Sequence, residues 1–203
     1  MATVYVNDDD MTAIANSIRN KMGIELPLKP SQFAKALDPL IVIKNSLQSF
    51  LDKSITFYES QALTTVRRYG FAHNNRIHTI IIPNVTTIAD HGVYRCRILK
   101  SVTLTNCTTI GDSAFTGCEY LASIELPSIT HLGKWVFNEN VRLKSLTLSG
   151  NTVCTVDDDS FLHDTAIANN HGFIYVPSNL VDTYKAASGW STYANQIIAI
   201  PES

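Results

Sequence analysis

Four short segments recur at intervals of 22 residues, and this repeat constrains the fold more than any other feature of the chain. The segments begin at Thr79, Ser101, Ser123 and Ser145. In each of them apolar residues alternate with polar ones, with Ile81 as the exception, which is typical of a strand that buries one face. One unit of this length cannot bury its own apolar face, so the repeat predicts a solenoid in which neighbouring units stack.

Three further apolar positions recur behind each strand. They form the columns Ile88, Ile110, Leu132 and Val156, then Val93, Phe115, Phe137 and Phe161, then Leu99, Leu121, Leu143 and Ile167, with Val66, Phe71 and Ile77 one unit earlier. The columns predict about five coils within residues 51–171 and a weakly matching first strand near residues 55–57. Insertions after Ser149 and near Asn169 lengthen the last units. We expect little helix, limited to one turn per coil that Asp112 and its equivalents cap.

The carboxy-terminal residues 172–203 predict a cap of mixed α/β structure. An apolar helical face that includes Tyr184 is followed by Trp190 and Tyr193, and such large side chains can cover the open end of the last coil. The apolar run at residues 197–200 predicts a final edge strand.

The amino-terminal residues 1–50 differ in kind from the repeat. Residues 11–21 and 30–37 carry helix start and stop signals and predict two short helices. The amphipathic stretch at residues 40–51 is expected to link them to the solenoid or to pair with another subunit. We therefore predict a small α-helical module that serves docking or oligomerisation.

The residues of one unit carry a family resemblance. Ser123-Ile-Glu-Leu-Pro-Ser-Ile-Thr-His-Leu-Gly-Lys-Trp-Val-Phe137 and its neighbours resemble the BspA-like leucine-rich repeat, over roughly residues 60–170. The chain departs from that pattern at Val93, where the family has Phe, and at Asn74 and Asn140, where it has Cys. The resemblance implies a leucine-rich repeat solenoid, dominated by β-structure with short helical turns. It also implies interaction or adhesion as a function.

A second resemblance concerns the first 50 residues. Ile14-Ala-Asn-Ser-Ile-Arg-Asn-Lys-Met-Gly23, followed by Leu28-Lys-Pro-Ser-Gln-Phe-Ala-Lys-Ala-Leu37, is similar to a small module at the start of many bacteriophage and prophage virion proteins. It implies a structural protein of a virion, on tail, fibre or head, that docks through this module. The partners would be other virion proteins or a host cell-surface receptor, protein or glycan, and a homo-oligomer is expected. The alternative is a bacterial leucine-rich repeat protein of interaction or adhesion.

The cysteines follow the repeat. Cys96 and Cys118 share one column 22 residues apart, and Cys107 takes an apolar position. No Cys-x-x-Cys pair occurs. Buried reduced thiols are the favoured interpretation, with a disulfide or a metal role as the alternative.

Other polar residues give no catalytic or metal-binding pattern. The six histidines show no His-x-x-x-His spacing. The run at residues 157–159 lacks the alternating ligands and the Gly of a calcium loop, so we expect it to cap the turn before Phe161. The triplet at residues 111–113 lacks the frame of a nucleophile elbow. We assign no catalytic residue, no metal and no cofactor, and we do not expect an enzyme.

Charge and targeting signals narrow the partners and the location. The formal net charge is -2 and the Lys and Arg residues are scattered. The sequence therefore predicts no basic patch that would bind nucleic acid. The amino terminus lacks the basic start and apolar run of a signal peptide, and no apolar stretch has the length of a membrane helix. We expect synthesis in the host cytoplasm, no membrane insertion and, under the phage interpretation, a place in the virion.

Outward strand positions are the remaining candidates for function. The third residue of each repeated five-residue segment points away from the core if the alternation holds. These residues are Ile81, Thr103, Glu125, Thr147 and Tyr175. We predict them as a recognition stripe, although single apolar residues on a surface also occur without a function.

Overall fold

The computed structural model describes residues 56–158 and 160–202. The chain divides into two units, residues 1–48 and 49–203, and every described residue belongs to the second unit. The predicted helical module at residues 1–50 therefore lies outside the described residues. So do the sequence features that resemble virion proteins.

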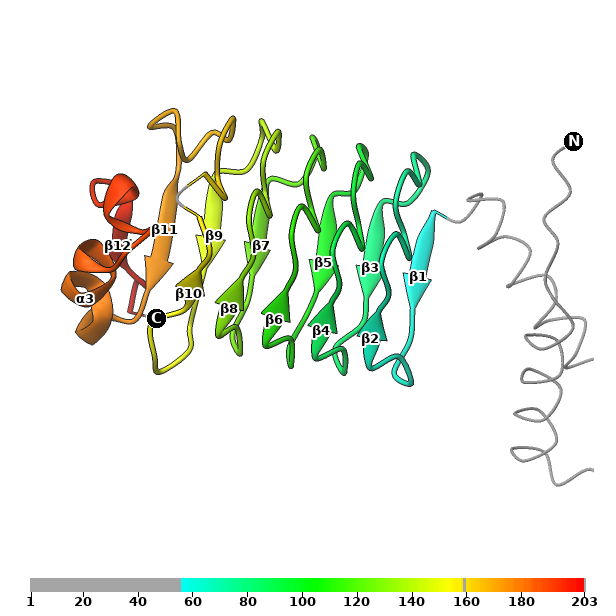
Figure 1. The fold of residues 1–203 in the computed structure, drawn as a ribbon, viewed down its shortest axis with the longest axis horizontal. Coiled ribbons are helices and arrows are strands. Elements are labelled where there is room, and N and C mark those ends of the chain that lie inside the picture. The colour runs from blue at the N-terminus through cyan, green and yellow to red at the C-terminus, as the bar shows by residue number, and fades with distance from the viewer. Residues whose placement is uncertain (1–55, 159, 203) are drawn as a thin grey trace, which may run out of the picture. The chain divides into compact units, whose positions relative to one another are not determined.

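The second unit is a β-solenoid in which each coil contributes two short strands to two rows (Figure 1). The first row consists of β1 (Phe57–Glu59), β3 (Thr79–Ile81), β5 (Ser101–Thr103), β7 (Ser123–Glu125), β9 (Ser145–Thr147) and β11 (Phe173–Val176). The second row consists of β2 (Thr65–Val66), β4 (Thr87–Ile88), β6 (Thr109–Ile110), β8 (His131–Leu132) and β10 (Thr155–Val156). Six first-row strands mark about six turns, one more than the sequence analysis expected.

Strands of one row pair in parallel with the register that the 22-residue period predicts. Thr79 pairs with Ser101, and Ile88 pairs with Ile110. The second row forms one five-stranded sheet, whereas the first row is hydrogen-bonded as two sheets, β1-β3-β5 and β7-β9-β11-β12. The expected first strand near residues 55–57 was placed too early. The strand spans Phe57–Glu59, because its pairing with Thr79 fixes the register.

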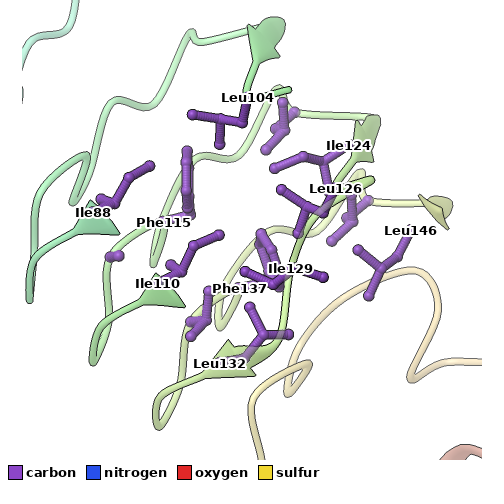
Figure 2. Close-up of a cluster of buried hydrophobic side chains, with 14 of the residues drawn as sticks. Ile88, Leu104, Ile110, Phe115, Ile124, Leu126, Ile129, Leu132, Phe137 and Leu146 are labelled. Carbon is purple, nitrogen blue, oxygen red and sulfur yellow. The ribbon is translucent and has the colours of Figure 1, made fainter. Parts of the chain in front are cut away.

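The inward columns form one continuous core between the rows (Figure 2). Ile110, Phe115 and Leu132 have no exposed surface, and the rings of Phe115 and Phe137 stack with centroids 5.8 Å apart. Val156 departs from its column and is only partly buried. Each fully buried side chain of this size contributes about 1.5 to 3 kcal/mol before conformational entropy is subtracted.

The connecting segment that follows each second-row strand differs from the prediction. The structure assigns turns rather than helix to these segments in the described coils. Asp112 does not cap its own coil, because its Oδ1 accepts a hydrogen bond from the Lys134 amide of the next coil at 2.8 Å. Asp90 does the same for the Asp112 amide at 3.1 Å. Gly133 lies against the Asp112 carboxylate, where a Cβ atom would come within 2.5 Å of Asp112 Oδ1.

The carboxy-terminal residues cover the last coil. They form η1 (Ser178–Leu180), α3 (Val181–Ala186), η2 (Ser191–Tyr193) and the edge strand β12 (Ile197–Ala199). Trp190 is fully buried, packs edge-on against Phe161 at 4.9 Å, and donates a hydrogen bond from Nε1 to the Cys154 carbonyl at 2.7 Å. None of the helices that the structure describes has the length and apolarity needed to span a bilayer.

Truncation of the stacked phenylalanines tests the register of the core. We expect Phe115→Ala to lower the free energy of unfolding by about 3 to 5 kcal/mol, because it removes a fully buried ring and leaves a cavity. Urea denaturation of the full chain measures this loss. Phe57→Ala is the matched control, since Phe57 is 53% exposed, and it should cost less than about 1 kcal/mol. Equal losses would contradict the assigned register.

Candidate functional site

The five predicted recognition residues lie in one row on the outer side of the first-row strands. Ile81 pairs with Thr103, Glu125 pairs with Thr147, and Thr147 pairs with Tyr175. The parallel pairing separates neighbours by about 4.8 Å. Thr103 and Glu125 are exposed, and the other three are partly buried. The stripe is therefore continuous except between β5 and β7, where the described strands form no ladder.

A second outward row, which the sequence analysis did not identify, lies two residues earlier in each strand. It consists of Phe57, Thr79, Ser101, Ser123, Ser145 and Phe173. The same alternation that gave the first stripe could have found it. Phe57 and Phe173 are 53% and 45% exposed, and the rings of Phe173 and Tyr175 contact each other with centroids 6.4 Å apart. We call the two rows together the strand face.

The centre of the strand face carries small polar side chains, and its two ends carry aromatic side chains. Small hydroxyl side chains occupy the middle, where the Ser101 hydroxyl donates to the Thr79 hydroxyl at 3.2 Å. Glu125 and Glu59, which pairs with Ile81 at the β1 end, are the charged residues of these outward rows. A hydroxyl needs a neighbouring base to become a nucleophile, and no histidine or lysine occupies either row. Such a surface can form hydrogen bonds and apolar contacts with a partner.

The histidines and aspartates near the last coils form local contacts. His131 Nε2 lies 3.4 Å from the Asp157 carboxylate, and His163 Nδ1 lies 3.1 Å from that of Asp164. Asp158 Oδ1 accepts hydrogen bonds from the amide and hydroxyl of Ser160, both at 2.7 Å, and so holds the turn before Phe161 as predicted. Within residues 56–158 and 160–202, no three His, Cys, Asp or Glu side chains gather to hold a metal ion.

All four cysteines are buried, and none of them forms a disulfide. The Cys118 thiol donates to the Val93 carbonyl at 3.3 Å. Burial raises the pKa of Cys107 from 9.0 to about 11 and that of Cys154 to about 12, and it holds the pKa of Cys118 well above its ordinary value. A thiol reacts as its thiolate, so these residues are core side chains rather than nucleophiles at neutral pH.

The raised pKa values predict that stability falls in alkaline solution. Burial also raises the pKa of Tyr184 from 10.0 to about 12, so above pH 9 the unfolded chain loses protons that the folded chain keeps. Unfolding then becomes more favourable, by up to about 1.4 kcal/mol per group and pH unit. Urea midpoints from pH 7.5 to 10.5 measure this decline. The double variant Cys107→Ala, Cys154→Ala should show a shallower decline, and identical slopes would contradict the assignment.

Comparison with known proteins identifies the repeat. A family model described as BspA type leucine rich repeat region, with six copies, matches residues 43–170. No curated protein matches the chain significantly. The six copies agree with the six first-row strands more closely than with the five predicted coils. Because the match covers more than half of the sequence, the chain belongs to the BspA-type leucine-rich repeat family.

Proposed function

We propose that this chain is a non-enzymatic binding protein, acting in protein binding or adhesion, and that its solenoid presents the strand face to a partner protein. The observation that carries the proposal is the in-register array of outward side chains with exposed rings at its ends. Repeat solenoids commonly bind partners through such extended surfaces. The buried thiols and the absence of histidine and lysine from both outward rows favour binding over catalysis.

The aromatic ends are the expected anchors of this interface. Aromatic residues are enriched where binding energy concentrates, because they bury a large area with little loss of conformational entropy. Phe173 and Tyr175 stand on the same strand, β11, which is held between β9 and β12. Their backbone is therefore fixed before a partner binds. The hydroxyl groups between the ends would supply hydrogen bonds around this anchor.

Removal of one aromatic anchor tests the strand face. We expect the double variant Phe173→Ser, Tyr175→Ser to weaken binding of the labelled full chain to bacterial cell surfaces by tenfold or more, at roughly 1.4 kcal/mol per factor of ten. Trp135→Ser is the matched control, because Trp135 is 47% exposed but lies outside the strand face. Protease treatment of the cells should abolish binding if the partner is a protein. Equal losses in both variants, or no binding by the unaltered chain, would refute the proposal.

The biological setting is a finer part of the proposal. We infer a structural protein of a bacteriophage virion, synthesised in the host cytoplasm, attached to tail, fibre or head by residues 1–50 and assembled as a homo-oligomer. The sequence resemblance of residues 14–37 to virion modules supports this setting. The second candidate is a bacterial leucine-rich repeat protein of interaction or adhesion, and the family match supports it at least as well.

Deletion of residues 1–50 separates the two settings. Under the virion proposal, the full chain co-purifies with particles released by lysis, whereas the deletion variant stays outside them and keeps a folded solenoid. Immunoblots of purified particles and a circular dichroism melt measure the two properties. The strand-face double variant is the control and should still enter the particles. A full chain that is absent from particles favours the bacterial candidate, and a deletion variant that still enters them contradicts the docking role.

A further inference from the structure

Charge is distributed unevenly along the solenoid, although the whole chain is close to neutral. Residues 60–111 contain six Lys or Arg and a single Asp. Residues 112–203 contain four Lys or Arg and ten Asp or Glu. Such separation creates a local electrostatic field that the net charge of -2 does not reveal. The first coils are therefore basic and the later ones acidic.

All six basic residues of the first coils lie in two adjacent connecting segments. One segment joins β2 to β3 and the other joins β4 to β5. The segments stack directly, because the Phe71 amide donates to the Gly92 carbonyl at 2.7 Å and the His73 amide donates to the Tyr94 carbonyl at 2.8 Å. We call this group the basic strip. It consists of Arg67, Arg68, Arg76, Arg95, Arg97 and Lys100.

Aromatic rings support two of these guanidinium groups. Arg68 lies over the ring of Tyr69 at 5.2 Å, and Arg95 lies over the ring of Tyr94 at 5.1 Å. His91 bridges the two tyrosines with ring centroids 5.1 Å from each. A stacked guanidinium keeps its N–H edges free to pair with an oxyanion in a fixed geometry. Tyr94 is partly buried among these neighbours, whereas Tyr69 stays 50% exposed.

Most of the basic strip has no carboxylate partner of its own. Arg97 pairs with Glu119 at 3.4 Å. Within residues 56–158 and 160–202, the structure gives the other five members no ion pair. Like charges on two stacked segments repel each other and cost stability. Their concentration on one side of the solenoid is therefore unfavourable for the isolated chain.

The backbone beneath the strip follows the conformation of the repeat. Tyr69, His73, His91 and Arg95 have φ values of 59°, 59°, 57° and 53°. The left-handed region costs a residue with a Cβ atom about 1 to 2 kcal/mol. Gly117 occupies the position equivalent to Arg95 one coil later, with φ of 72°, so the fold accepts glycine there. Ser113, Trp135 and Glu139 adopt the same conformation at equivalent positions of later coils, so it belongs to the repeat and is not specific to the basic strip.

We propose that the basic strip is a second interaction surface, which binds an acidic segment of a partner protein. The free edges of the guanidinium groups match carboxylates, which accept two parallel hydrogen bonds from arginine. Five charged side chains that form no ion pair within the described residues favour a partner recognised by its charge. This surface lies on the connecting segments and not on the strand face, so it is independent of the function proposed above.

A fluorescent peptide of consecutive glutamates provides the probe. Anisotropy with the full chain should show saturable binding that weakens as salt rises. The triple variant Arg67→Gln, Arg76→Gln, Lys100→Gln changes exposed side chains for which no ring contact is described, and we expect it to weaken binding about tenfold. The matched control is Lys134→Gln, Lys144→Gln, Lys185→Gln outside the basic strip, with the same charge change and no ring contact described for any of the three residues. It should change the affinity by less than about twofold.

A conservative pair of substitutions tests the geometry. Arg68→Lys with Arg95→Lys keeps the charge but removes the planar guanidinium edges, and we expect peptide binding to fall several-fold. Unsaturable binding, or equal losses in both triple variants, would overturn the proposal. Tighter binding of single-stranded DNA or of a sulfated polysaccharide of matched charge would overturn the assignment to protein. A failure of the peptide-binding test does not contradict the proposed function of the strand face. The basic-strip variants should still bind to cells, because they leave the strand face unchanged.

Discussion

The in-register stacking of one coil on the next is the interaction on which every other feature of this solenoid depends. Backbone hydrogen bonds join successive coils on all three sides. Examples are the Ile82 amide with the Thr103 carbonyl at 3.1 Å, the Thr108 amide with the Thr86 carbonyl at 2.9 Å, and the Phe115 amide with the Val136 carbonyl at 2.9 Å. A single coil has no such partners, so it gains stability only from its neighbours. The insertions fall between strands because a shift within a strand would break the pairing on both sides.

Local alternation was sufficient to predict most of the core. The inward residues of strands β3 to β9 and the Phe column follow from a period that is visible in the sequence, since each apolar residue recurs at the same place in its unit. The first strand was misplaced because its alternation is weak, and only the pairing of Phe57 with Thr79 fixes it. The sixth first-row strand, β11, was predicted within the carboxy-terminal cap because an insertion near Asn169 interrupts the period before it.

Contacts between coils were harder to predict, because they join residues that are distant in sequence. Thr108 Oγ1 donates to the Thr86 carbonyl at 3.2 Å, and Thr130 Oγ1 donates to the Thr108 carbonyl at 3.0 Å. The carboxylate of Asp112 reaches the next coil in the same way. A cap is usually sought a few residues along the chain, whereas here the acceptor and donor are 22 residues apart. The basic strip was missed because charges were counted over the whole chain, where they cancel.

The residues that stabilise the solenoid are different from the residues that it exposes on its surface. Most inward positions are fully buried, so a substitution there costs several kcal/mol. Outward strand positions and the exposed parts of the connecting segments usually tolerate change within about 0.5 kcal/mol. The strand face and the basic strip occupy different sides of each coil and share no residue. Their physics also differs, since hydroxyl and aromatic contacts depend little on salt and exposed charges depend on it strongly. One repeat can therefore carry two surfaces that vary independently while the columns between them stay fixed.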